Sequence, residues 1–144
     1  MSGTTRKFRL GTVLRLARND EREAQTNVAR ADREAELAEE QVVEARARLE
    51  DAGLSTVTTV ADLRRQRQRT ELRAQDAIEA ERRREELLAD ALAARTEWLA
   101  AVRRRRSLEG LEERHTATRA ALASRASQKA LDDLASIRRA RGVR

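Results

Sequence analysis

The sequence predicts an all-α fold, a long antiparallel two-helix coiled-coil hairpin whose second helix projects beyond the first. Three observations predict it. The 144 residues contain no proline and only five glycines, so almost nothing interrupts a helix. Charged residues make up 39% of the chain, which leaves little large apolar surface for a thick core. Apolar residues in the first third recur at alternating steps of four and three, the a/d repeat of a left-handed coiled coil.

The first predicted helix spans about residues 6–52, and its apolar stripe is nearly unbroken. Only one charged residue interrupts the stripe, and alanine is its commonest member, so a partner helix can approach closely. The stripe runs through Leu10, Leu14, Ala17, Glu21, Ala24, Val28, Ala31, Ala35, Ala38, Val42, Ala45, Leu49 and Ala52. A stripe with this spacing is expected to face a second helix along its whole length.

A turn is predicted over residues 53–59. Gly53 is expected to end the first helix, because glycine tolerates the left-handed conformation found just past helix ends. The residues that follow are uncharged and rich in Thr and Val, unlike the rest of the chain. Thr59, with Asp62 three residues later, resembles a capping box in which Asp replaces the usual Glu. Thr58 is the alternative cap.

The second predicted helix spans about residues 60–140 and is roughly 120 Å long, against roughly 65 Å for the first. Leu88, Leu92, Leu99 and Val102 keep one phase of its apolar stripe. After the basic run at 103–106 the stripe shifts to Leu108, Leu111, Leu122, Ala126, Ala130, Leu134 and Ile137. The part beyond about Val102 is therefore expected to project or to find another partner. The whole chain, residues 1–144, is predicted to be a single coiled-coil domain.

Composition and spacing argue against an enzyme. The chain has no cysteine, so it forms neither a disulfide nor a thiolate metal site. His115 is the only histidine and is expected on a helix surface. Adjacent carboxylates such as 39–40 and 85–86 diverge by about 100° on a helix, so they do not form an acid–base pair. We predict no catalytic residue, no cofactor and no metal, and a protein that works by binding other proteins.

The charge pattern leaves two further classes open. The net charge is +6 and the pI about 11.1, but acidic residues are interleaved with the basic ones, as on a solvated helix face. Arg103–Arg106 is the best argument for nucleic acid, although no aromatic residues stand between the arginines to stack on bases. The alternatives are therefore a generic homodimerising structural coiled coil and a basic coiled coil associated with nucleic acid.

Three stretches, one at the N-terminus and two in the C-terminal third of the chain, resemble one known family. Phe8-Arg9-Leu10, with Val13-Leu14 and Leu16 and then a charged helix with Glu21, resembles the start of the flagellar export protein FliJ family. The stretch from Arg105 to Arg114 is similar to the family pattern R-x-x-L-E-x-L-x-E-R. Residues 128–138 resemble its closing pattern, Q-x-x-L-D-[DE]-x-A-x-x-R. Residues 55–100 carry no such signature.

The resemblance implies a non-enzymatic, stalk-like coiled coil of the flagellar type III protein export apparatus. Family members bind the hexameric export ATPase (FliI), contact the export-gate protein (FlhA) and escort export chaperones. A location in the cytoplasm is implied, peripheral at the inner face of the cell membrane only through other proteins. This agrees with the absence of any run of about 20 apolar residues and of a signal peptide.

The family motifs imply which residues bind the export ATPase, and the matching positions of this sequence lie in its N-terminal segment and in the motif at 105–114. They are Phe8, Leu10, Val13, Leu14, Arg105, Arg106, Leu108, Glu109, Leu111 and Arg114. Leu10 and Leu14 also belong to the heptad stripe, so burial against the second helix is the alternative for both. For the arginines of 103–106, the alternative is a solvated face.

Overall fold

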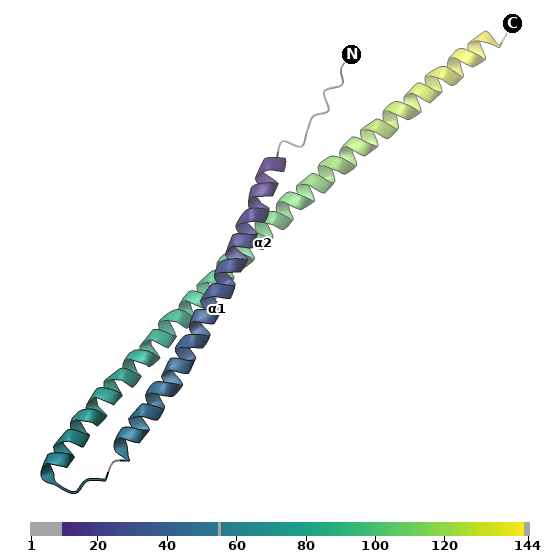
Figure 1. Cartoon of the computed structure of the whole chain (residues 1–144). Helices are drawn as coiled ribbons and strands as arrows, with labels where there is room; N and C mark the ends of the chain where they lie inside the picture. Colours follow the sequence, from purple (N-terminus) through teal and green to yellow (C-terminus); the bar gives the residue numbers. More distant parts are fainter. Residues whose placement is uncertain (1–9, 55, 143–144) are drawn as a thin grey trace. The chain divides into compact units, whose positions relative to one another are not determined.

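The computed structural model describes residues 10–54 and 56–142. They form two long helices, α1 (Gly11–Gly53, 43 residues) and α2 (Val60–Arg141, 82 residues), which are joined by a short loop (Figure 1). The described residues contain no strand. The helices pack against each other as a helical hairpin, so the predicted all-α fold is confirmed. The predicted start of the first helix, at residues 6–9, lies outside the described part of the chain.

Two compact units divide the described residues. The hairpin unit is residues 20–101 and contains the loop. The terminal unit is residues 10–19, from the start of α1, together with residues 102–142, from the end of α2. Both helices therefore contribute to both units.

The apolar stripe predicted in α1 is its buried side. In the hairpin unit, Val42 is 1% exposed, and four alanines of the stripe are buried with it: Ala35, Ala38, Ala45 and Ala52. In the terminal unit, Leu14 and Ala17 are buried. Leu10 is the exception, because it lies more than one third exposed at the start of the helix. The heptad repeat thus identified the surface with which α1 meets α2.

Three of the four residues predicted for the stripe of α2 lie one residue away from the covered side, whereas the fourth, Val102, is half-buried. Leu88, Leu92 and Leu99 are 50%, 66% and 47% exposed, so they do not face α1. The covered positions each lie one residue earlier: Leu87 and Ala91 are buried, and Trp98 is half-buried. The physical reason is that α1 presents mainly alanines, so the close seam has room for few large side chains of α2, here Leu87 and Trp98, and three other leucines stay largely exposed.

The predicted shift of phase after residues 103–106 is also corrected in the terminal unit. Arg105, Leu108, Glu112 and His115 are half-buried and keep the four–three spacing of the covered side. Leu111 lies off this side and is exposed. From residue 116 to residue 142 every side chain is exposed, including Leu122, Leu134 and Ile137.

Helix α1 ends without a left-handed residue. The helix ends at Gly53, as predicted, but no described glycine has a positive φ, so the left-handed conformation expected there is not found. Instead the Leu54 N–H donates a hydrogen bond to the Asp51 carbonyl (3.2 Å), and the Gln66 side-chain amide of α2 donates one to the Gly53 carbonyl (3.2 Å). Carbonyls at a helix end need such partners, because no further turn of the helix supplies them.

Helix α2 begins with the predicted capping box. The Asp62 N–H donates to the Thr59 hydroxyl oxygen (3.1 Å), and that hydroxyl donates to the Asp62 carboxylate (2.7 Å). Thr59, rather than Thr58, is therefore the cap. The hydrogen bond from the Thr59 hydroxyl, together with the ion pair to Arg65, holds the pKa of Asp62 below its ordinary value of 3.8.

We expect Thr59→Ala to lower the free energy of unfolding by about 1 kcal/mol, because it removes the N-cap oxygen. Thr58→Ala, one residue earlier and also exposed, is the matched control and should change stability by less than about 0.5 kcal/mol. Urea unfolding followed by circular dichroism, at one protein concentration, measures both. Equal losses in the two variants would contradict the assignment of the cap.

The cap should also depend on pH. Since the folded-state pKa of Asp62 is lowered, its stabilising contribution is present above the unfolded-state pKa and is lost as the pH falls through the folded-state value. Asp62→Asn should therefore destabilise the chain at neutral pH, and the difference from the unaltered protein should vanish under strongly acidic conditions. Unfolding curves at several pH values test this, and a difference that is constant with pH would contradict it.

The buried alanines should resist enlargement. Ala38 is 2% exposed and lies in a cluster with Ala35 and Leu87, so Ala38→Leu must force the two helices apart locally. We expect it to destabilise the chain by about 1–3 kcal/mol. Ala47→Leu, at an exposed position of the same helix, should change stability by less than about 0.5 kcal/mol. Urea unfolding of both variants makes the comparison.

Candidate partner-binding site

Every candidate residue that the structure describes lies in the terminal unit. This unit brings together residues that are about ninety positions apart in the sequence, from the start of α1 and from the middle of α2. They are Leu10, Val13, Leu14, Arg105, Arg106, Leu108, Glu109, Leu111 and Arg114. Phe8 lies outside the described residues.

Burial separates these candidates into two groups. Leu14 is 2% exposed and Leu108 is half-buried, so both hold α1 and α2 together within the unit. Leu10, Val13 and Leu111 are exposed, so a partner can reach them. For Leu14 the alternative of burial against the second helix is confirmed, whereas Leu10 remains accessible.

The exposed apolar surface includes one residue of the N-terminal family motif that was not in the predicted binding set. Leu16 is 58% exposed, and with Leu10 and Val13 it places an apolar side chain at every third position of α1. Residues three apart are neighbours on a helix surface, so the three side chains form one short apolar strip beside the covered side. The signal for Leu16 was its large apolar side chain at a position outside the heptad stripe.

One carboxylate joins the two helices of the unit. Oε1 of Glu109 accepts hydrogen bonds from Nη2 and Nε of Arg18, at 3.1 and 3.3 Å. Its other oxygen, Oε2, accepts one from Nη1 of Arg105 at 2.6 Å. Arg18 lies on α1, and both other residues lie on α2, so Glu109 bridges the helices. Arg18 was not predicted, because its role depends on how the two helices are aligned.

The basic run at 103–106 is therefore not one uniform surface. Arg105 is half-buried and pairs with Glu109, whereas Arg103 and Arg106 are exposed. Nε of Arg114 donates to the Gly110 carbonyl of the preceding turn at 3.1 Å, which keeps its guanidinium close to α2. Arg105 and Glu109 thus hold the unit together, and Arg106 is the arginine of the candidate set that is most available to a partner.

Two kinds of site are not found in the described part of the chain. No group of three or more His, Cys, Asp and Glu side chains lies close enough together there to hold a metal ion. Neither described helix has a stretch sufficiently long and apolar to span a bilayer. What the terminal unit offers is an exposed apolar strip, an exposed apolar residue on α2 and accessible arginines, which suit contact with another protein.

Comparison with known proteins gives one match. The family model described as Flagellar FliJ protein matches residues 6–144, essentially the whole chain. No match was found among curated proteins or among solved structures. The family match covers residues of both segments of the terminal unit. It also covers residues 55–100, which carry no sequence motif of the family. The chain therefore belongs to the flagellar FliJ protein family.

Proposed function

We propose that this component of the flagellar export apparatus is a stalk-like coiled coil whose terminal unit binds the hexameric export ATPase. The observation that carries the proposal is the exposed apolar strip of α1, Leu10, Val13 and Leu16, in the same unit as exposed Leu111 of α2. Large apolar side chains near the centre of an interface supply most of its binding energy. In this proposal the chain contributes contacts and no catalytic group.

The charge of the terminal unit supports a partner surface that is acidic. Its described residues carry thirteen basic and five acidic side chains, a net charge of +8 with His115 neutral. Opposite charge on the partner raises the rate of association and orients the complex, and added salt weakens both effects. The apolar residues would then provide affinity, and the arginines would provide steering.

Two further partners belong to the proposal. We propose that the chain also contacts the export-gate protein and escorts export chaperones, as the family relationship implies. Its place would be the cytoplasm, next to the membrane-embedded apparatus and held there through proteins. The finding that neither described helix could cross a bilayer is compatible with this placement.

The first test compares two pairs of exposed apolar residues. Val13→Ala with Leu111→Ala should weaken binding to the export ATPase by about tenfold or more, since two accessible contacts are lost in the terminal unit. Val43→Ala with Leu72→Ala removes the same side-chain types from exposed positions of the hairpin unit, and should leave binding unchanged. A pull-down and an ATPase assay with the purified ATPase of the same organism measure the effects. If the unaltered chain neither binds nor stimulates the ATPase, the proposal fails.

The second test separates contact from stability at two adjacent residues. Leu14→Ala should destabilise the chain by about 2–5 kcal/mol, because it empties a fully buried site. Val13→Ala should change stability by less than about 0.5 kcal/mol, because its side chain is exposed, and should still weaken ATPase binding. Unfolding curves give the stability of each variant, and binding assays give the affinity of each variant for the ATPase. Loss of stability in Val13→Ala would show that its effect on binding is indirect.

A further inference from the structure

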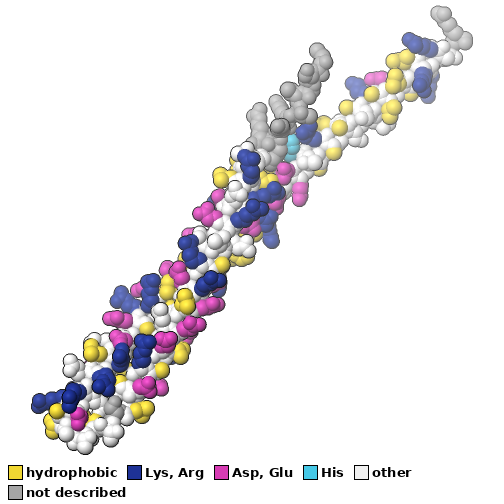
Figure 2. Space-filling view, viewed as in Figure 1, with side chains coloured by type: hydrophobic (Ala, Val, Ile, Leu, Met, Phe, Trp, Pro, Cys, Tyr) yellow, Lys and Arg dark blue, Asp and Glu magenta, His cyan; other side chains and the backbone are white. Residues whose placement is uncertain are grey.

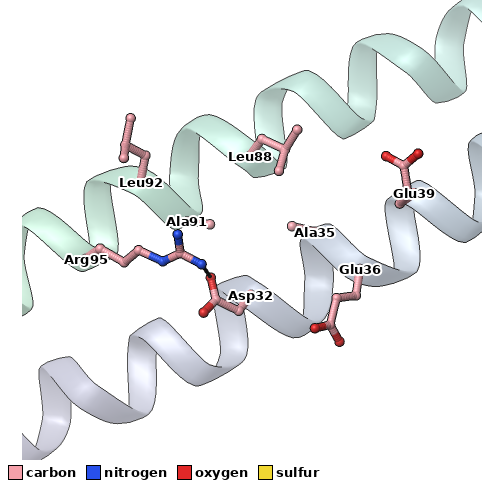
Figure 3. A pocket seen from close by; sticks show the side chains of 8 residues that line it. All are labelled: Asp32, Ala35, Glu36, Glu39, Leu88, Ala91, Leu92 and Arg95. Carbon is pink, nitrogen blue, oxygen red and sulfur yellow. Dashed lines mark hydrogen bonds and ion pairs between the residues drawn. The ribbon is translucent and has the colours of Figure 1, made fainter.

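A groove runs between the two helices on one flank of the hairpin unit (Figure 3). Ala35 of α1 and Ala91 of α2 form its floor, where the helices approach each other. The α2 side carries Leu88 and Leu92, which are exposed, and the α1 side carries Glu36 and its neighbour Glu39. We call this the acidic groove. The α2 wall is apolar except for Arg95, which pairs with Asp32 across the groove, and the α1 wall is negatively charged. The groove therefore suits an amphipathic helix with one apolar and one basic edge.

The negative charge of the α1 wall is only partly neutralised. Asp32 forms an ion pair with Arg95 at 2.8 Å, and Glu39 forms one with Arg84 at 3.3 Å. Glu36, and Glu40 beside the groove, have no ion pair within the described residues. Between residues 32 and 44, α1 carries six acidic side chains and one basic side chain, a net charge of −5.

The apolar wall continues beyond the groove along the same edge of α2. Leu88, Leu92 and Leu99 lie on one heptad stripe, and all three are exposed; Arg95, which pairs with Asp32, occupies the heptad position between Leu92 and Leu99. Helix α2 already packs against α1 through one heptad stripe, and this stripe is a second one. Two apolar stripes on one helix are typical of bundles with more than two helices. An uncovered stripe of leucines next to unpaired carboxylates therefore predicts a third helix of positive charge.

The C-terminal part of α2, residues 116–141, has the required properties. Every side chain in it is exposed, and hydrophobic side chains lie along it (Figure 2). It carries six basic and two acidic residues, a net charge of +4. Five of its apolar residues follow the spacing of the same edge of the helix, Ala120, Ala123, Ala130, Leu134 and Ile137, whereas Leu122 and Leu131 lie off this edge. With 26 residues it is about 39 Å long, more than the roughly 20 Å of α1 between residues 32 and 44.

The distribution of charge over the whole chain matches this pairing. Residues 20–101 contain 20 acidic and 14 basic side chains, a net charge of −6, whereas the remaining residues have a net charge of +12. The overall value of +6 conceals this contrast. Two copies can bring an acidic hairpin unit and a basic C-terminal segment together, and the attraction is strongest at low ionic strength.

We propose that residues 116–141 of one copy dock in the acidic groove of a second copy, and that two chains exchange these segments to form a dimer. A second copy is the occupant that the charges favour, because its segment 116–141, with a net charge of +4, complements the carboxylates of the groove. Mutual exchange uses both grooves and both segments, so the assembly closes at two chains.

The dimer is distinct from the proposed ATPase complex and does not depend on it. It covers the apolar edge of residues 116–141, which the monomer leaves in water. Covering that edge protects the chain from non-specific association while no other partner is bound. A partner that binds the same segment would compete with the second copy.

The test uses the full chain, which has no cysteine of its own. Leu92→Cys, in the acidic groove, is mixed with Ser127→Cys, on the apolar edge of the segment. An intermolecular disulfide between the two variants should form about tenfold faster than in the control mixture, where Leu37→Cys replaces Leu92→Cys. Leu37 is an exposed leucine of α1 that lines a different surface depression. Equal rates in the two mixtures would overturn the proposal.

Charge reversal provides an independent test. Sedimentation of the unaltered chain over a concentration series should show a monomer–dimer equilibrium that weakens with added salt. Glu36→Lys with Glu40→Lys should raise the dimer dissociation constant by about tenfold or more, with unchanged helix content by circular dichroism. Adding Arg125→Glu and Lys129→Glu to that variant should restore dimerisation in part. A chain that sediments as a monomer at every concentration, or a reversal without effect, would overturn the proposal.

Discussion

The alanine surface of α1 is the constraint on which the rest of the structure depends. Ala35, Ala38, Ala45 and Ala52 leave room for a helix to approach closely, but each buries little apolar area. A close seam between two helices has space for few large side chains, and the hairpin unit uses it for Val42 and Leu87. The other leucines of α2 in the hairpin unit therefore lie outside, where they are available to partners. The seam explains both the fold and the apolar surface that the fold leaves exposed.

How far the sequence predicts the fold follows from the same constraint. In α1 the heptad positions from Leu14 to Ala52 are all buried or half-buried, so the heptad repeat identified the covered side, although other apolar residues such as Val13 and Leu16 are exposed. In α2 they differ: Arg84 and Arg105 are half-buried, whereas Leu88 and Leu92 are exposed. Large apolar residues dominate a hydrophobic pattern, but the shape of the opposite helix decides which positions are covered. That shape is a property of the pair and cannot be obtained from α2 alone.

The candidate site shows a similar division. Motifs near both ends of the chain predicted residues that the terminal unit does bring together. They did not separate Leu14, which is buried, from Val13, which is exposed, although the heptad repeat raised burial as an alternative for Leu14. The Arg18–Glu109 ion pair could not be predicted, because it joins residues 91 positions apart and depends on the alignment of the helices. The spacing of residues within one helix is readable from sequence, whereas alignment between helices requires the structure.

Charge adds a second level of organisation to this seam. Across the hairpin unit, ion pairs join Asp32 to Arg95, Glu39 to Arg84 and Arg46 to Glu81, so many charges stabilise the alignment of the helices and are not free for ligands. Each such exposed pair contributes less than about 1 kcal/mol, but together they disfavour shifted alignments. The remaining positive charge is concentrated at the ends of the chain. A pI of about 11.1 is therefore weak evidence for nucleic acid here, since the acidic hairpin unit would repel phosphates while the basic ends attract acidic protein surfaces.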